Sequence, residues 1–127
     1  MVTTINPPRL DFVDALVGLG WELVVVGDSS TPESWEDVVG CHFLSIARQV
    51  ELFPTLGSLV PEKTYARKNF GFLFAIQLGA TEIWELDDDN FPHSDPSTAV
   101  DFSVAQVARH VQWVNYFRIF YPGTAIW

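Results

Sequence analysis

The sequence predicts an α/β fold in which helices flank a mostly parallel sheet. Over the first ninety residues, short apolar runs alternate with stretches whose apolar residues recur at helical spacing, a pattern typical of strands joined by crossover helices. The chain has 127 residues, of which 48% are hydrophobic and 18% are charged. That is enough for one compact domain and too apolar for a disordered chain. We therefore expect a single domain over residues 1–127.

The first strand and the first helix are expected before residue 20. Met1 to Ile5 has the composition of a strand, and Pro7 and Pro8 end it because proline cannot donate to a sheet ladder. Apolar residues then recur at helical spacing until a pair of glycines stops the helix. These apolar residues and glycines are Leu10, Val13, Leu16, Val17, Gly18 and Gly20.

The second strand is expected at Trp21 to Val26, which is apolar apart from Glu22 and leads into Gly27 and Asp28. Such a run fits a strand that is buried on both faces, with a turn at its carboxyl end. The segments that follow are expected to be a turn at Ser29–Trp35, a short helix at Ile46–Phe53 and a loop at Gly57–Pro61.

The longest predicted helix runs from Lys63 to Gly79, with one internal glycine at Gly71. Apolar residues surround this helix, so its later turns are expected to be covered on most sides. Thr81 to Leu86 is expected to form the third strand, which leads into an acidic run. After a polar loop that follows Phe91, one more amphipathic helix is expected at Ser103–Phe117.

Composition excludes several classes of function. Sixteen acidic and seven basic residues give a net charge of −9, which repels nucleic acid and anionic lipid, so we expect no nucleic-acid partner. The single cysteine, Cys41, excludes an internal disulfide or a thiolate metal cage and is expected to be a small buried apolar residue. No run reaches the roughly 18 apolar residues of a spanning helix, so we expect no membrane span in this chain. We expect no secretory signal either.

Three consecutive aspartates, Asp87, Asp88 and Asp89, follow the third predicted strand. Like charges about 4 Å apart repel by roughly 1 kcal/mol in water and about four times as much near a protein surface, so something should offset the repulsion. Clustered carboxylate oxygens suit Mg²⁺ or Mn²⁺, and magnesium commonly binds through one or two carboxylates plus substrate phosphates. A solvated acidic turn without a ligand is the alternative.

Basic residues gather at the start of the longest predicted helix, where Lys63, Arg67 and Lys68 are three of the seven in the chain. Cations there oppose the helix dipole at a cost of roughly a few tenths of a kcal/mol each, whereas a bound anion would reverse the sign. Arginine is suited to bidentate contacts with phosphate. The alternative is ordinary surface ion pairs with Glu62 or with the aspartates.

Asp28 follows the second predicted strand and precedes Ser29 and Ser30. In open α/β sheets, ligands bind outside the carboxyl ends of the strands, where an aspartate can accept hydrogen bonds from a ribose or a base. The alternative is that Asp28 caps its own turn. If the long helix starts at that edge, Asp28, Arg67 and the acidic run face one crevice, and a metal diphosphate that bridges them would explain why their charges are tolerated.

The segment from Tyr65 to Asn90 resembles the STELLO-type glycosyltransferase-like family, which typically carries Tyr-Ala-Arg-Lys-Asn-x-Gly on a helix and then Asp-Asp-Asp-Asn. The same segment is more distantly similar to family 2 glycosyltransferases, whose pattern is an Asp-x-Ser turn, Ala-Arg-Asn-x-Gly and then Asp-x-Asp. Earlier segments also look like STELLO-type motifs: Thr4–Pro8, Trp21–Asp28 with Thr31, Pro32 and Trp35, and Leu44, Ser45 and Gln49.

The resemblance implies a GT-A fold, which is Rossmann-like, and a nucleotide-sugar donor, for which we expect a UDP-sugar. It implies that Asp28 contacts the nucleoside and Arg67 the donor. Asp87 and Asp89 then form the Asp-x-Asp (DXD) metal-binding pair for Mn²⁺ or Mg²⁺, with Asp89 as the favoured ligand. The full set of expected donor-binding residues is Thr4, Asp28, Arg67, Lys68, Asp87 and Asp88.

The end of the chain departs from the family pattern. Around Asn115–Trp127 the family usually has Asn-Pro-Tyr and Trp-Pro-Arg-Gly, whereas this sequence has Asn-Tyr-Phe-Arg and stops at the tryptophan. We therefore expect the N-terminal, donor-binding half of the fold, truncated before the acceptor half, and assign no catalytic base. Relatives in eukaryotes are expected in the Golgi behind a membrane anchor, so this chain is expected in the Golgi if such an anchor is missing upstream and in the cytoplasm otherwise.

Two other functions stay open. The first is a catalytically inactive glycosyltransferase-like interaction module that self-associates or docks through exposed apolar surface, an idea motivated by ten phenylalanines and five tryptophans. The second is a sugar-nucleotidyltransferase, which would also use carboxylates and Mg²⁺. That class should carry a glycine-rich phosphate loop near the first strand, and Thr3 to Pro8 contains no glycine.

Overall fold

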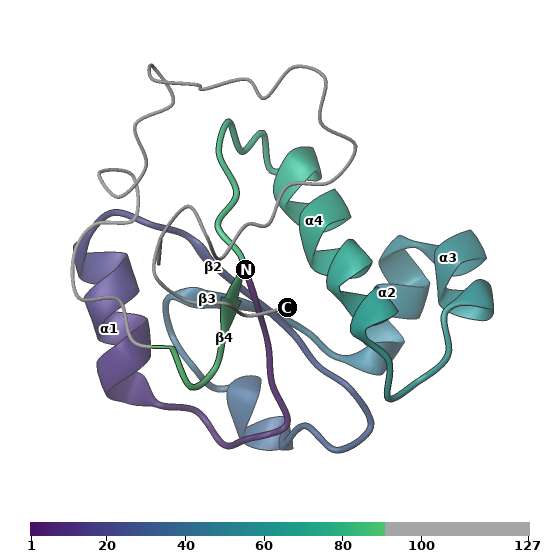
Figure 1. The fold of residues 1–127 in the computed structure, drawn as a ribbon, viewed down its shortest axis with the longest axis horizontal. Helices are drawn as coiled ribbons and strands as arrows, with labels where there is room; N and C mark the ends of the chain where they lie inside the picture. Colours follow the sequence, from purple (N-terminus) through teal and green to yellow (C-terminus); the bar gives the residue numbers. More distant parts are fainter. Residues whose placement is uncertain (91–127) are drawn as a thin grey trace, which may run out of the picture.

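The computed structural model describes residues 1–90, which form three layers with a parallel sheet between helices (Figure 1). The strands run in the order β3-β2-β1-β4, and every pairing between neighbours is parallel. The predicted α/β fold is thereby confirmed, and it is compatible with part of a Rossmann-like domain. The strands of this sheet are β1 (Val2–Thr3), β2 (Leu23–Val26), β3 (Cys41–Leu44) and β4 (Leu86–Asp87).

The helices lie on both sides of the sheet. Figure 1 shows α1 on one side and α4 on the other, with α2 and α3 to the right of α4. Two short 3₁₀ turns, η1 and η2, occur in the connections. The bounds are α1 (Leu10–Gly18), η1 (Glu33–Trp35), α2 (Ile46–Leu52), α3 (Pro54–Leu59), η2 (Tyr65–Arg67) and α4 (Lys68–Gln77).

β2 is the centre of the core because both of its faces are buried. Leu23 and Val25 join a hydrophobic cluster with the inner face of α1, whereas Val24 and Val26 join a second cluster that includes Phe70 of α4. Successive side chains of a strand point to opposite faces, so a continuous apolar run is what a strand covered on both sides requires. The predicted two-sided burial of this strand is confirmed.

α1 confirms the predicted helix at Leu10–Gly18. Its buried residues, Phe12, Val13 and Leu16, lie on one face at helical spacing and pack against the sheet. Leu10 is 61% exposed, so it belongs to the outer face although it shares the apolar spacing. The chain leaves the helix through Gly20, whose φ of +85° is a conformation that glycine adopts without a steric penalty.

α4 approaches the sheet most closely at Gly71. A Cβ atom there would lie 2.5 Å from Met1 Cγ and 2.7 Å from Val26 Cγ2, well inside the contact distance of two carbon atoms. Glycine at this position lets the helix backbone rest on Met1, which precedes β1, and on Val26, the last residue of β2. The first residues of α4 are thereby placed beside the carboxyl end of β2.

The helix that leads to this contact starts later than predicted. Lys63 has a φ of +57°, which is the left-handed region and incompatible with a position inside an α-helix. η2 follows, and the α-helix begins only at Lys68. The outer face is also less covered than predicted, since Leu73 is 39% and Ile76 is 61% exposed.

Among residues 1–90, one strand was not predicted. β3 has a weak sequence signal, because His42 is exposed and only Leu44 is fully buried. Its backbone nevertheless pairs with β2 along its whole length. Cys41 is half-buried against the α1 cluster rather than fully buried, and burial raises the pKa of its thiol.

The predicted loop at Gly57–Pro61 is wrong over its first three residues, which belong to α3. Glycine and serine are poor helix formers, and they concealed this helix in the sequence. Packing on α2 compensates for them: a Cβ at Gly57 would lie 3.0 Å from the Val50 Cα. The short helix before it is confirmed as α2, at Ile46–Leu52.

The strand expected at Thr81–Leu86 is wrong in its bounds. Leu86 pairs with Val2, the first residue of β1, so the residues before Leu86 have no strand residue to pair with. β4 is accordingly confined to Leu86–Asp87. Likewise, the first strand occupies only Val2–Thr3 of the expected Met1–Ile5.

The helix predicted at Ser103–Phe117 and the polar loop after Phe91 lie outside the described residues. Within residues 1–90, none of the helices combines the length and the apolar character that crossing a bilayer demands.

Candidate functional site

A cleft of about 600 Å³ opens at the carboxyl edge of the sheet, and we call it the carboxyl-edge cleft. The ends of β1, β2 and β4 and the turn before α4 all contribute to its wall. It contains five of the six predicted donor-binding residues and both predicted metal ligands. The predicted residues that line it are Thr4, Asp28, Arg67, Asp87, Asp88 and Asp89. Arg67 and the acidic residues therefore lie at the same edge of the sheet, as the predicted shared crevice requires.

Asp28 stands in the wall of this cleft with its side chain 17% exposed. Its Oδ1 accepts a hydrogen bond of 2.6 Å from the backbone N–H of Ser29, and its Oδ2 accepts one of 2.7 Å from the backbone N–H of Lys63. The first bond is the predicted capping of its own turn. The second holds the left-handed residue Lys63 in place, so Asp28 also fixes the segment that leads to Arg67.

Arg67 is the buried cation of the cleft, with only 5% of its side chain exposed. Its Nη1 donates a hydrogen bond to Gln49 Oε1, and its Cζ lies 5.6 Å from the centre of the Phe70 ring. Its Nε lies 3.9 Å from Asp28 Oδ1, which makes an ion pair but is too far for a hydrogen bond. Within residues 1–90, this Nε is the buried side-chain polar atom without a hydrogen-bond partner.

Gln49 of α2 was not predicted to have a role of its own, and it is fully buried. Its Nε2 donates two hydrogen bonds of 2.7 Å, to the carbonyl oxygens of Gly27 and Leu44. The amide thus joins the end of β2 and the end of β3 to Arg67. A lone glutamine in an amphipathic helix has no sequence signal of this kind, because its partners lie on other strands.

The three aspartates have different surroundings. Asp88 Oδ2 accepts hydrogen bonds from Thr4 Oγ1 and, at 2.7 Å, from Asn6 Nδ2. Asp87 is exposed and accepts a hydrogen bond of 3.2 Å from Lys68 Nζ. Asp89 is exposed and lines the cleft. Part of the charge repulsion is therefore offset by side chains of the chain itself, and Asn6 is a contributor that the sequence did not single out.

Lys68 does not line the cleft, in contrast to the prediction that it binds the donor. Its Nζ forms ion pairs with Glu85 and Asp87, and the hydrogen bond to Glu85 is the main reason that the pKa of Lys68 is raised. The alternative of an ordinary ion pair with acidic neighbours thus describes Lys68. Of the three predicted cations, Lys63 and Arg67 line the cleft.

The residues 1–90 contain no preformed cluster of three or more histidine, cysteine or acidic side chains that could hold a metal ion. The cleft does offer two exposed carboxylates, those of Asp87 and Asp89. Magnesium is often bound by one or two carboxylates with the remaining positions filled by water and substrate phosphates. The residues therefore fit a divalent cation that arrives together with a phosphate-bearing ligand.

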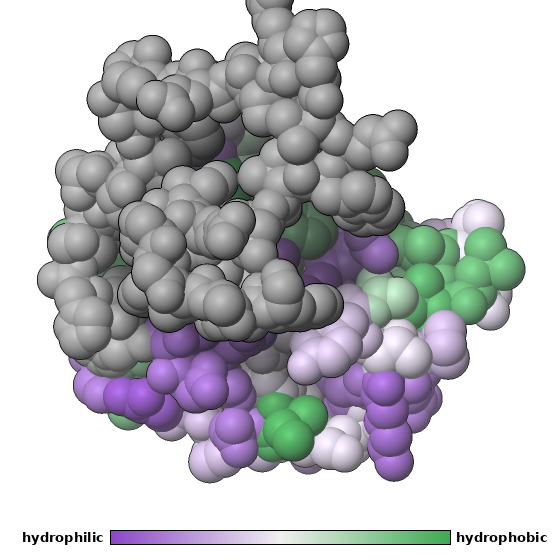
Figure 2. Space-filling view, viewed as in Figure 1, coloured by the Kyte–Doolittle hydropathy of each residue, from purple (hydrophilic) through white to green (hydrophobic). Residues whose placement is uncertain are grey.

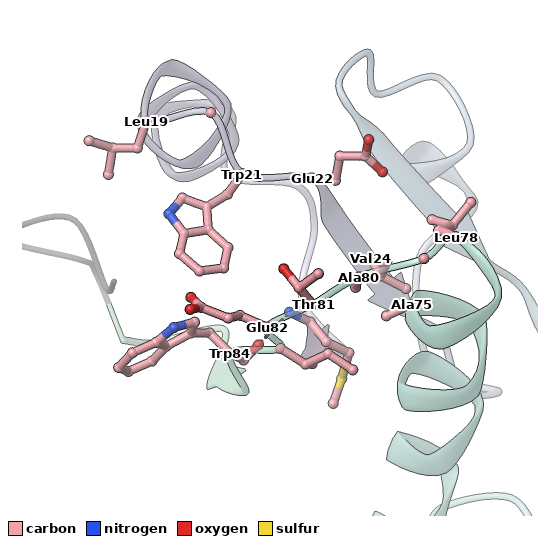
Figure 3. Close-up of a pocket in the computed structure, with 14 residues that line it drawn as sticks. Leu19, Trp21, Glu22, Val24, Ala75, Leu78, Ala80, Thr81, Glu82 and Trp84 are labelled. Atoms are coloured by element: carbon pink, nitrogen blue, oxygen red, sulfur yellow. Dashed lines mark hydrogen bonds between the residues drawn. The ribbon is translucent and has the colours of Figure 1, made fainter. Parts of the chain in front are cut away.

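A second cavity, of about 470 Å³, lies at the amino-terminal edge of the sheet (Figure 3). Trp21 and Trp84 line this cavity, and their rings make an edge-to-face contact with centroids 6.5 Å apart. The Met1 amine donates a hydrogen bond of 2.6 Å to Trp84 O, and burial lowers the pKa of this amine to about 6. None of the predicted site residues lies here, which leaves the carboxyl-edge cleft as their meeting point.

Comparison with known proteins gives two relatives. Two Arabidopsis thaliana proteins, named Probable glycosyltransferase STELLO1 and Probable glycosyltransferase STELLO2, are each 41% identical to this chain over 69 residues. The match confirms the resemblance to the STELLO-type glycosyltransferase-like family. It covers 54% of this chain and 9% of each STELLO protein, so the chain spans about a tenth of the length of these relatives. No protein-family model matches the chain.

The STELLO-type motif noted in the sequence can now be placed on the fold. Its Tyr-Ala-Arg segment forms η2, its Lys-Asn-x-Gly segment forms the first turn of α4, and its Asp-Asp-Asp-Asn segment forms the end of β4 and the turn after it. That turn is closed by a hydrogen bond of 3.0 Å from Asn90 N to Asp87 O. Most of the motif residues that carry charge thus gather at one edge of the sheet.

Proposed function

We propose that the carboxyl-edge cleft binds a nucleotide-sugar donor, most simply a UDP-sugar, together with Mn²⁺ or Mg²⁺, for transfer of the glycosyl group. One observation carries the proposal. The buried guanidinium of Arg67 lines the same cleft as the acidic tip of β4, by which we mean Asp87, Asp88 and Asp89. A metal diphosphate has both the negative oxygens that suit arginine and the cation that suits aspartates. The resemblance to two proteins named as probable glycosyltransferases points the same way.

The size of the cleft supports a ligand of this class. Sites for small molecules commonly have volumes of roughly 300–1,000 Å³, and this cleft has about 600 Å³. Its position also agrees with the general rule that ligands of open α/β sheets bind outside the carboxyl ends of the strands. The second cavity has a suitable size as well, so it is the position at the carboxyl ends of the strands, together with the aspartates, that favours the carboxyl-edge cleft.

Each residue has a part in this proposal. Asp87 and Asp89 would hold the divalent cation, which when bound supplies Lewis-acid stabilisation of a diphosphate leaving group. Arg67, whose side chain is buried in the cleft wall, adds positive charge that stabilises the departing diphosphate. Asp28 orients the nucleoside by hydrogen bonds. Thr4 and its partner Asp88 hold the acidic turn against the end of β1.

Isothermal titration of the full chain with UDP and UDP-sugars, with and without Mn²⁺, tests the proposal. The wild type should bind in the presence of Mn²⁺, and Asp89→Ala should lose at least about tenfold in affinity, equivalent to ~1.4 kcal/mol. Asp37→Ala is the matched control, because Asp37 is an exposed acid outside the cleft. Equal affinity of Asp89→Ala and the wild type would remove Asp89 from the site.

A specific observation supports the second candidate, an inactive interaction module. α3 has no buried residue, and at this end of the molecule Leu59 is 73% and Val50 43% exposed. Figure 2 shows apolar surface over the same end. Size-exclusion chromatography with and without UDP and Mn²⁺ separates the two candidates. A pure interaction module should self-associate, or bind a partner, without any response to nucleotide or metal.

A further inference from the structure

We propose that Gln49 is a positioning residue, which keeps the Arg67 guanidinium from closing its ion pair with Asp28 into a hydrogen bond and so leaves it available to the phosphates of the donor. The inference rests on the proposed function and concerns the same cleft. It starts from two observations: a fully buried amide that contacts Arg67, and a buried guanidinium that stops just short of a carboxylate.

The amide of Gln49 can have only one orientation. Its two N–H groups are both used, by the carbonyl oxygens of Gly27 and Leu44. If the amide turned over, its own oxygen would face these two carbonyl oxygens, and an acceptor cannot pair with an acceptor. The strand ends therefore fix Gln49 Oε1 toward Arg67, as a neutral acceptor at a fixed place.

The position of Arg67 follows from this acceptor. Its Nη1 is bonded to Gln49 Oε1, whereas its Nε lies 3.9 Å from Asp28 Oδ1 and has no hydrogen-bond partner. A movement of about 1 Å would convert this approach into a hydrogen bond of ordinary length. A charge-assisted bond between guanidinium and carboxylate is among the strongest available, and the contact with Gln49 opposes that movement.

Loss of the Gln49 acceptor should therefore weaken donor binding. Without Gln49 Oε1, the guanidinium is expected to turn toward Asp28 and form the missing bond. Arg67 and Asp28 are both assigned to the donor, so a direct pair between them would occupy both. Gln49 would then act on donor binding through Arg67, although it is buried beneath the cleft wall and does not line the cleft.

Two substitutions separate this role from a general contribution to stability. Gln49→Met keeps the approximate length and volume of the side chain but removes every hydrogen bond. Gln49→Glu keeps an acceptor for Arg67 but replaces the donating amide nitrogen by an oxygen that faces the carbonyls of Gly27 and Leu44, so it is expected to lower stability more than donor binding. We expect Gln49→Met to weaken Mn²⁺-dependent UDP binding about tenfold, as for the loss of one charged contact. Gln49→Glu should stay within about threefold of the wild type.

A double-mutant cycle with Arg67→Met tests whether Gln49 acts through Arg67. In the Arg67→Met background, Gln49→Met should change UDP affinity no further, whereas additive losses would overturn the inference. If the wild-type chain binds no UDP, the proposed function fails and the inference fails with it. Binding by the wild type with additive losses overturns the inference alone.

A nucleotide-free measurement reports on the same contact. The Arg67 Hε resonance in a ¹H–¹⁵N spectrum should move downfield in Gln49→Met, because Nε–H acquires Asp28 as an acceptor. An unmoved resonance in the folded variant would overturn the inference. If Gln49→Met does not fold, Gln49→Glu is measured instead, with an unmoved Hε and near wild-type UDP affinity as the expected result. A loss in Gln49→Glu as large as that of Arg67→Met would overturn it.

Discussion

The hydroxyl of Thr4 donates a hydrogen bond to the carboxylate of Asp88, a residue 84 positions further along the chain. Thr4 is only 5% exposed, and its Oγ1 also accepts a hydrogen bond of 2.9 Å from the backbone N–H of Asn6. This single hydroxyl therefore ties the end of β1 to the acidic turn after β4. The arrangement explains how three adjacent aspartates keep a fixed place in the cleft wall.

Thr4→Val should destabilise the fold, because valine has nearly the same shape but leaves Asp88 and the Asn6 N–H without this partner. We expect the free energy of unfolding in urea to fall by about 1–2 kcal/mol. Thr55→Val on exposed α3 is the matched control and should change it by less than about 0.5 kcal/mol. Equal effects of the two substitutions would mean that the Thr4 hydroxyl contributes nothing specific.

Gly71→Ala should also destabilise the protein. The added methyl group would meet Met1 and Val26 at 2.5 and 2.7 Å, and the flexible Met1 side chain can move aside more easily than Val26 in the sheet. Overpacking of this kind costs about 1–3 kcal/mol, measurable as a lower midpoint of urea unfolding. Gly18→Ala, which would meet no atom within 4 Å, should be neutral or stabilising by about 0.4–1 kcal/mol. A neutral Gly71→Ala would contradict the close approach of α4.

The ion pairs of Lys68 should make stability depend on pH at the alkaline end. Glu85 and Asp87 raise the pKa of Lys68 in the folded state, so the stabilisation is fully present below the ordinary lysine pKa of about 10.4. It is lost as the pH rises through the higher, folded-state value. Because the acidic partners are largely exposed, the effect is at most about 1 kcal/mol.

The matched comparison for this prediction is Lys68→Met. The stability difference between the wild type and Lys68→Met in urea should be positive at neutral pH and should shrink above the ordinary lysine pKa. A difference that does not change with pH would show that packing of the Lys68 stem, rather than its charge, stabilises the fold.

The sequence was sufficient to predict that Asp28, Arg67 and the three aspartates lie at one edge of the sheet. Parallel strands present their carboxyl ends at the same edge of a sheet, and β2 was recognisable from its uninterrupted apolar run. The start of the next helix next to that edge was the remaining assumption. The structure meets it through Gly71, which brings the first turn of α4 against Val26 at the carboxyl end of β2.

The finer details of the cleft depend on tertiary contacts that no local pattern encodes. Gln49 bonds to Arg67 across 18 positions, and Asn6 bonds to Asp88 across 82. The left-handed backbone of Lys63 is likewise stabilised from a distance, by the Asp28 carboxylate. From spacing alone, Lys63 was therefore placed inside a continuous helix, and Gln49 and Asn6 were given no role in the cleft.

Arg67 and the aspartates at the end of β4 line one cleft, and we propose that this cleft is the site of a metal diphosphate. Paramagnetic broadening of tryptophan indole N–H signals by Mn²⁺ in the presence of UDP tests it most directly. Trp35 Nε1 donates to Asn6 O, beside the acidic turn, whereas Trp21 and Trp84 line the cavity at the opposite edge. We predict that Trp35 broadens first and that Arg67→Met and Asp89→Ala each weaken the effect. Earlier broadening of Trp21 and Trp84, or no response to UDP, would contradict the claim.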